Sequence, residues 1–137
     1  MVKAYIDSDI ILDVLNERIE FKQHSMLVLS LCESGRINGF TTPLAIANIN
    51  YILRKQNPNQ RVPKIKLVLA ILKLIDVNES DVINALHSDF SDFEDGIQSY
   101  AATRNNCNLI ISRNIKDYKH SPIQAISPAE FINQFFE

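Results

Sequence analysis

Short apolar runs alternate with helical patterns along the whole chain, and this alternation limits the folds that it can adopt. Residues 2–6, 39–41, 109–112 and 124–126 have the length and composition of strands buried in a parallel sheet, and a brief strand is expected at Val77. The segments between them repeat apolar residues at helical spacing. This order predicts an α/β fold, a three-layer α/β/α sandwich around a mainly parallel sheet. At 137 residues we expect a single domain, 1–137.

Turn and capping residues indicate where the helices begin and end. Gly35 is placed to stop a helix in the left-handed conformation, while Thr42-Pro43 and Ser127-Pro128 are typical N-cap and first-turn pairs. Helices are expected over residues 10–15, 26–32, 44–53, 65–75, 80–86 and 95–106, and after Ser127. In such folds ligands bind beyond the carboxyl ends of the strands, so polar residues at those ends are the candidates for function.

The bulk composition is that of an ordinary globular protein, with 46% hydrophobic and 22% charged residues and a net charge of −2. No apolar stretch approaches the roughly 20 residues of a membrane helix, and the N-terminus enters a strand without a signal-peptide pattern. We therefore expect a cytoplasmic protein with no membrane contact. Cys32 and Cys107 lie far apart in apolar surroundings and are expected to be free buried thiols.

Charge is distributed unevenly along the chain. Residues 54–73 contain six basic and no acidic side chains, and residues 76–95 contain seven acidic and no Lys or Arg side chains. One interpretation is two solvated helix faces. The other is a rim that attracts phosphate, including Arg54 and Lys55, beside an acidic metal pocket.

Acidic residues follow two expected strands and begin one expected helix. Asp7 closes the first strand, Asp117 follows the third, and Asp95 ends an acidic cluster that also contains Asp92 and Glu94. Carboxylates that converge from distant parts of a chain are what a Mg²⁺ or Mn²⁺ site on a phosphodiester needs. Because clustered carboxylates repel one another unless a cation neutralises them, we favour a metal site. The alternative is that these acids cap helix N-termini.

Four further polar residues are candidates for a supporting role. Asn48 lies in an apolar helix, where an amide needs a partner, and an internal hydrogen bond is the alternative to a role in the site. Asp9 could cap the first helix or face the site. Ser112 ends a strand and could contact phosphate or bond the loop, and Asn114 could cap a helical turn instead of joining the site. Scattered histidines and only three glycines argue against a zinc site or a phosphate-binding loop.

Four segments, in this order and spacing, resemble the PIN domain family, the metal-dependent ribonuclease fold of VapC-type toxins. Residues 7–13 (DSDIILD) are similar to the opening D-T-N-x-x-L-D, and residues 111–118 (ISRNIKDY) to I-T-R-N-x-x-D-F. Residues 92–95 (DFED) lead into a helix. Residues 47–55 (ANINYILRK) resemble a subgroup that carries Asn48 in place of the usual second acidic residue.

The resemblance implies a sheet of strand order 3-2-1-4-5 and cleavage of single-stranded RNA by an enzyme that is the toxin of a toxin–antitoxin pair. Asp7, Asp95 and Asp117 would be catalytic and would hold Mg²⁺ or Mn²⁺ together with Glu94, with Asp9, Asn48, Asp92, Ser112 and Asn114 in support. Arg54, Lys55 and Arg113 would contact RNA. An antitoxin and a homodimer are possible partners. Residues 65–75 could provide the dimer face, and a role in the core is the alternative for this segment.

Two departures from the family pattern keep alternatives open. The neutral Asn48 lowers the negative charge of the pocket, so the second hypothesis is an RNA-binding or scaffold module with weak or no nuclease activity. Asp9 replaces the usual Asn and restores a carboxylate. A third hypothesis, a dehalogenase-type phosphatase suggested by residues 7–9 (DSD), lacks the Thr expected at position 11, which is Ile.

Overall fold

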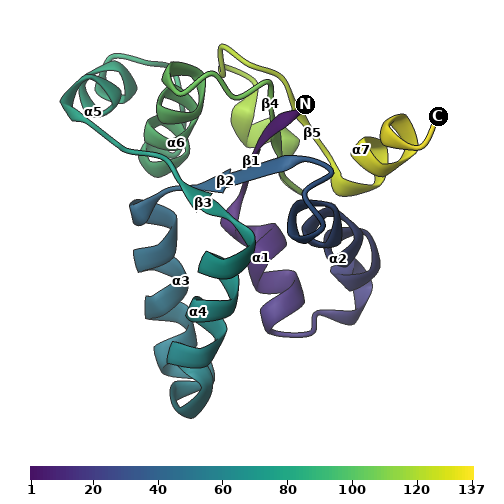
Figure 1. Ribbon diagram of the computed structural model, residues 1–137. Coiled ribbons are helices and arrows are strands. Elements are labelled where there is room, and N and C mark those ends of the chain that lie inside the picture. The colour runs from purple at the N-terminus through teal and green to yellow at the C-terminus, as the bar shows by residue number, and fades with distance from the viewer.

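The computed structural model describes all 137 residues and contains a five-stranded sheet with helices on both faces (Figure 1). All neighbouring strands are parallel, and their order is β3-β2-β1-β4-β5, so the expected order is confirmed. The strands are β1 (Lys3–Ile6), β2 (Asn38–Thr41), β3 (Lys73–Leu74), β4 (Leu109–Ile111) and β5 (Ala125–Ile126).

Seven α-helices and two short 3₁₀ segments connect the strands. They are α1 (Ser8–Leu15), α2 (Ile19–Glu33), α3 (Pro43–Gln56), η1 (Pro58–Gln60), α4 (Arg61–Ile71), α5 (Glu79–Leu86), α6 (Phe93–Arg104), η2 (Ile115–Tyr118) and α7 (Pro128–Phe135). The expected caps are present, since the Thr42 and Ser127 side chains accept hydrogen bonds from Ala45 N and Glu130 N. None of the helices has both the length and the apolar character needed to cross a bilayer.

Two apolar cores lie on the two faces of the sheet, which confirms the three-layer sandwich. Along β1, Ala4 and Ile6 point into a cluster of 18 buried residues shared with α1, α2, α3, α4 and α7. Tyr5, between them, points into a cluster of seven buried residues that includes Ala101 and Ala102 of α6. This alternation is the period of two that an extended strand imposes. Cys32 and Cys107 are free and buried, as expected.

One expected helix and one expected strand are misplaced. The helix expected over residues 65–75 ends earlier, at Ile71, and the next strand is Lys73–Leu74 rather than Val77. Leu72 is extended, with ψ of 144°, and Phe40 of β2 pairs with Lys73. The apolar pattern continues past Ile71, but pairing with the edge of the sheet overrides the helical period there.

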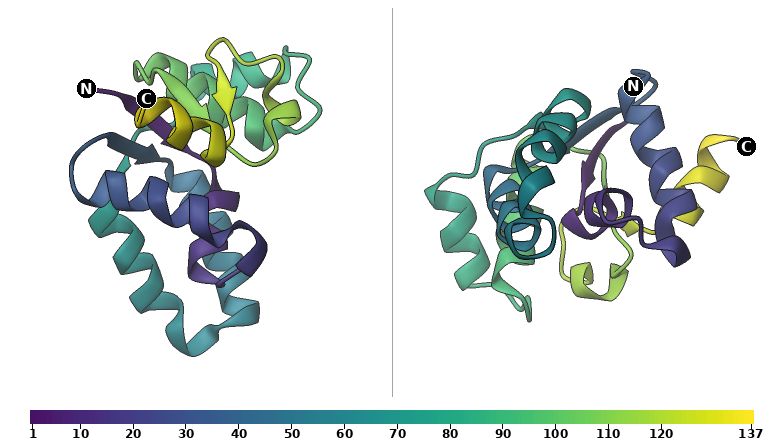
Figure 2. Two further views of the ribbon diagram at one scale, coloured as in Figure 1. Left: turned by 90° about the vertical axis from the view of Figure 1, so that its right-hand side faces the viewer. Right: turned by 90° about the horizontal axis from the view of Figure 1, so that it is seen from below.

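The register of the two central strands sets the position of the polar residues. Ile6 pairs with Ile111 in parallel, so the residues that follow them, Asp7 and Ser112, leave the same edge of the sheet side by side. Helices α3 and α4 pack on each other and project away from the sheet, toward the bottom of Figure 1 and in the left view of Figure 2. The arm formed by α3 and α4 therefore begins near this edge and extends outward.

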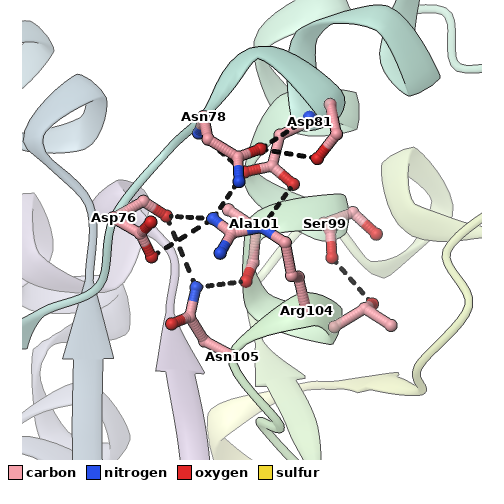
Figure 3. A network of polar contacts seen from close by, with 9 residues as sticks. Asp76, Asn78, Asp81, Ser99, Ala101, Arg104 and Asn105 are labelled. Carbon is pink, nitrogen blue, oxygen red and sulfur yellow. Dashed lines mark hydrogen bonds and ion pairs between the residues drawn. The ribbon is translucent and has the colours of Figure 1, made fainter.

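A partly buried ion pair connects α5 to α6 (Figure 3), with the Arg104 side chain 32% exposed. Arg104 Nη2 lies 2.8 Å from Asp81 Oδ2, and its Nε donates to Asp81 Oδ1 at 3.1 Å. Asp81 is only 1% exposed and also accepts a hydrogen bond from Asn78 N. The pair fixes the outer helix α5 against the far end of α6, the helix whose first turn carries the acidic cluster.

Candidate active site

Asp7 stands at the centre of the polar residues beyond β1 and β4. Its backbone N–H donates to Ile111 O at 3.0 Å, which holds it against β4. Its Oδ2 accepts from the Ser112 hydroxyl at 2.8 Å and from the Tyr118 hydroxyl at 2.9 Å. Asp7 occupies the N-cap position of α1, but its side chain makes no capping bond. The carboxylate is thus available to the site and not used by the helix.

The Tyr118 hydroxyl joins Asp7 to the acidic cluster. It lies 3.3 Å from Asp95 Oδ1 as well as 2.9 Å from Asp7 Oδ2. Because a phenol carries one proton, it donates to one carboxylate at a time and places both within reach of a single atom. Asp7 and Asp95, 88 residues apart in sequence, are therefore brought together at one point.

Asp9 forms a second anchor between α1 and the loop after β4. Its Oδ2 accepts from Asn114 Nδ2 at 3.1 Å and from Arg113 N at 3.3 Å, and Asn114 N donates to Ser112 Oγ at 3.0 Å. Its Oδ1 is buried with no hydrogen-bond partner. Asp9 and Asn114 both face the site, and neither makes a capping bond. Asn114 does occupy the N-cap position of η2.

The amide of Asn48 contacts the acidic cluster from the other side. Its Nδ2 donates to Glu94 Oε2 at 2.6 Å, so α3 and the first turn of α6 meet there. Asp92 is the N-cap of α6 and accepts from Asp95 N at 3.0 Å, which makes capping part of its role. Asp117 lies exposed on η2. Asn48 therefore makes the hydrogen bond that its structural interpretation expects, with a residue of the acidic cluster as its partner, and its role in the site stays a prediction.

Negative charge is disfavoured at this point of the molecule. Burial and the neighbouring charges of Asp7, Asp92 and Asp117 together raise the pKa of Asp95 to about 7, against the opposing effect of its bond to Tyr118. Burial and the charge of Asp7 raise the pKa of Asp9 to about 7. Burial also raises the pKa of Asp7, against the opposing effect of its bonds to Ser112 and Tyr118. A cation among these carboxylates would favour their ionised forms.

The donor set suits a hard divalent cation. Carboxylate oxygens are the ligands that Mg²⁺ and Mn²⁺ prefer, and the unpartnered Oδ1 of Asp9 is a further oxygen without a hydrogen-bonding role. No three Asp, Glu, His or Cys side chains converge closely enough to enclose an ion by themselves. Mg²⁺ is usually held by one or two carboxylates with water and substrate phosphate in the remaining positions, so the pair Asp7 and Asp95 meets its requirement.

The three expected RNA-contacting residues are not brought together. Arg54 and Lys55 are exposed near the end of α3, roughly 10 Å of helix beyond Asn48 at 1.5 Å per residue, and Lys55 lies 4.5 Å from the Tyr51 ring centroid. Arg113 adjoins the site through its backbone, but its side chain turns to Asp13, with 2.7 Å between Nε and Oδ2. The basic residues of α3 thus lie along the arm and not around the carboxylates.

Sequence reasoning assigned no role to Tyr118 or Asp13, although both lie within the motifs. Asp13 is fully buried and also accepts from Ser25 Oγ at 3.2 Å. An acid one turn after Asp9 in an otherwise apolar helix was a detectable signal, because a buried carboxylate requires partners. Tyr118 offered a weaker signal, the extra hydroxyl where the family pattern has Phe.

Comparisons with known proteins agree with this architecture. The "Ribonuclease VapC1" of Aquifex aeolicus (strain VF5) is 25% identical over 138 residues, covering 97% of this chain and 95% of that protein. The structure of VapBC2 from Rickettsia felis bound to a DNA fragment superposes with a TM-score of 0.73 at 15% identity, over 92% of this chain and 98% of the matched chain. PAE2754 from Pyrobaculum aerophilum has a TM-score of 0.69 at 10% identity, over 98% and 90%.

A sequence profile decides the family. The profile described as PIN domain matches residues 3–116, which include Asp7, Asn48, Asp95 and Asn114. The matched range contains β1 to β4, the arm and most of the carboxylate site, while Asp117, Tyr118 and β5 lie beyond it. This chain belongs to the PIN domain family.

Proposed function

We propose that this protein is a metal-dependent ribonuclease that cleaves single-stranded RNA. The observation that carries the proposal is the meeting of Asp7 and Asp95 at the Tyr118 hydroxyl, with further carboxylates close enough to raise the pKa of Asp95. Membership of the PIN domain family and the name of the Aquifex relative, a ribonuclease, support the same reaction class.

Each residue of the site has a distinct task in this proposal. Asp7 and Asp95 hold Mg²⁺ or Mn²⁺, and Asp117 and Glu94 complete the site directly or through water. The ion, when bound, activates a water and neutralises charge on the phosphodiester. Ser112 orients Asp7, Asn114 orients Asp9, Asp92 fixes the first turn of α6, and Asn48 positions Glu94. Arg54 and Lys55 attract the RNA backbone along α3.

We also propose that the protein is the toxin of a toxin–antitoxin pair and binds an antitoxin. Solved complexes of similar fold are VapBC assemblies, such as DNA-bound VapBC from Salmonella typhimurium, with a TM-score of 0.72 at 12% identity over 93% of this chain and 99% of that chain. Leu67 and Leu69 of α4 and Leu74 of β3 are exposed apolar side chains that a homodimer contact could cover. A neighbouring gene for a small DNA-binding protein that co-purifies with this chain would support the pair.

The decisive experiment compares wild type with Asp95→Asn on a panel of single-stranded RNAs. We expect cleavage only with Mg²⁺ or Mn²⁺, and a loss of about 100-fold or more in rate for Asp95→Asn, since the variant removes a charge aimed at the reacting centre. Asp89→Asn is the matched control, because Asp89 is an exposed acid of the same segment with no bond in the site. Wild type that cleaves no RNA with either metal would refute the nuclease.

A second candidate function is an RNA-binding module without efficient cleavage. It is favoured by Asn48, a neutral amide where the family pattern carries an acid, because the lost charge weakens the hold on a divalent cation. RNA binding by wild type and Asp95→Asn with equal affinity, together with no cleavage, would select this alternative.

A further inference from the structure

A cleft opens between α2, the loop after β4 and the start of α7. Its volume is about 250 Å³, and it is lined by Glu20, Phe21 and His24 of α2, by Arg113, and by residues 127–129 at the start of α7. The backbone N–H of Arg113 donates to Asp9 Oδ2, so the cleft and the site share this residue. The cleft therefore adjoins the loop after β4 that also carries Ser112 and Asn114.

Arg113 is held rigidly in the wall of the cleft. Its Nε donates to the fully buried Asp13 at 2.7 Å, and its guanidinium carbon lies 3.8 Å from the Phe21 ring centroid. Its side chain keeps 23% exposure, and its two η-nitrogens have no hydrogen-bond partner. A guanidinium fixed at Nε and stacked on a ring retains its remaining N–H donors for a ligand.

We propose that this cleft binds one base of the RNA, the base of a nucleotide next to the scissile phosphate. The inference rests on the proposed function and names a determinant of its substrate preference. Flat bases stack on aromatic rings and on guanidinium planes. Because Phe21 and Arg113 are stacked on each other, a base in the cleft stacks on the outer, exposed face of this pair. The volume lies below the roughly 300–1,000 Å³ of pockets for drug-sized ligands, which suits a single base.

The polar lining also selects among bases. Glu20 accepts hydrogen bonds and matches the exocyclic amine of adenine, cytosine or guanine, while uracil has no such amine. Arg113 and His24 supply donors for ring nitrogens and carbonyl oxygens. Glu20 also disfavours a phosphate in the cleft by charge repulsion. The cleft is therefore a site for an amine-bearing base and not for a second phosphate.

The test is an NMR titration of the full-length, isotope-labelled, metal-free protein with each nucleoside 5′-monophosphate and, separately, with inorganic phosphate. We expect AMP, GMP and CMP to shift the Phe21 ring and Arg113 Nε–H signals, and UMP to bind at least about 5-fold more weakly. Phe21→Leu should weaken binding about 5-fold or more through lost stacking. Glu20→Gln should reduce the discrimination against UMP to less than about 2-fold, because an amide both donates and accepts.

Phe136→Leu is the matched control. Phe136 also packs against an arginine, with the Arg36 guanidinium carbon 5.6 Å from its ring centroid, but it does not line the cleft. Binding that is equal in wild type, Phe21→Leu and Phe136→Leu would overturn the proposal. So would identical shifts with phosphate alone, or no shift with any nucleotide, which would leave the cleft to a peptide ligand.

The readout separates this inference from the nuclease itself. Base binding is measured without metal and without cleavage. If the protein binds AMP through Phe21 but cleaves no RNA, the nuclease proposal is refuted and the base-binding proposal is supported. If the protein cleaves RNA but Phe21→Leu does not change nucleotide binding, the base-binding proposal is refuted and the nuclease proposal is supported.

Discussion

At the scale of single residues, the Tyr118 hydroxyl is the atom on which the site is organised. Tyr118 is buried, with 3% of its surface exposed, and its hydroxyl lies within 3.3 Å of carboxylate oxygens of Asp7 and Asp95, which come from two distant segments. By donating to a carboxylate it favours the ionised form, which opposes the effect of burial on Asp7 and Asp95. Tyr118 therefore helps to keep both acids able to bind a cation.

Removal of this hydroxyl should move the pH dependence of cleavage. We expect Tyr118→Phe to raise the pKa of Asp7 and Asp95, and hence to shift the acidic limb of the pH–rate profile upward by about 0.5–1 unit. Tyr100→Phe is the control, since Tyr100 packs edge-on against Phe90 and its hydroxyl has no bond in the site. An unchanged acidic limb in Tyr118→Phe would show that the hydroxyl does not act on these carboxylates.

Asn48 allows the family's acid to be restored by one substitution. Asn48→Glu replaces a 2.6 Å hydrogen bond to Glu94 by two facing carboxylates. We expect a lower melting temperature without metal, because like charges repel, and about tenfold tighter Mn²⁺ binding by calorimetry, because a cation between them removes the repulsion. Asn59→Glu, on the exposed η1 segment, should change neither value. Unchanged Mn²⁺ affinity in Asn48→Glu would place Asn48 outside the metal site.

At the scale of elements, the position of α6 depends on contacts at both of its ends. Its first turn carries Glu94 and Asp95, and its last turn carries Arg104, which binds Asp81 of α5 and Asp76 (Figure 3). The Asp81 carboxylate is buried and depends on Arg104 for its neutralisation. The pair thus contributes specificity to how α5 packs on α6, although a buried ion pair adds little net stability compared with an apolar pair.

Breaking this pair on one side should be destabilising. Arg104→Met leaves the Asp81 carboxylate without its cation, and we expect the free energy of unfolding in a denaturant titration to fall by about 1–2 kcal/mol, less than for a fully buried pair because the Arg104 side chain is 32% exposed. Arg54→Met, at an exposed position without an ion pair, should change it by less than about 0.5 kcal/mol. A loss in Arg104→Met no larger than in Arg54→Met would mean that Asp81 is stabilised by other groups.

At the scale of the whole molecule, the raised pKa values of the carboxylate site lower the free energy of unfolding at neutral pH. Asp95 and Asp9 have pKa values of about 7 in the folded protein, against 3.8 ordinarily. Between these values the folded chain binds more protons than the unfolded chain. The free energy of unfolding therefore falls as pH rises through this window, and it levels off above about 7.

A metal ion should remove this slope. In thermal melts from acid to neutral pH, we expect the metal-free melting temperature to decrease as pH rises, and added Mg²⁺ or Mn²⁺ to raise it most at neutral pH, because the ion binds the ionised site of the folded state. Asp95→Asn should flatten the metal-free slope and weaken the metal effect. A metal-free melting temperature that rises from acid to neutral pH in wild type would contradict the raised pKa values.

Much of this protein could be predicted from its sequence because local signals and the global fold agree. The alternation of apolar strands with helical patterns determines the sandwich. The acids beyond β1 and before α6 indicated where a site is expected, although Asp92 also caps α6. Thr42 and Ser127 marked their helices correctly. The end of α4 was missed because pairing with β2, and not the apolar period, decides where that helix stops.

Only the tertiary structure decided how these residues meet. The sequence by itself determined the fold class, the family and which acidic residues are candidates for the site, because each of these depends on patterns within short segments of the chain. The bridge from Asp7 through Tyr118 to Asp95, the pairing of Asn48 with Glu94, and the Arg113 side chain between Asp13 and Phe21 join residues 23 to 111 positions apart. Which side chains touch across such distances follows from packing and register, and spacing in the sequence carries no information about them.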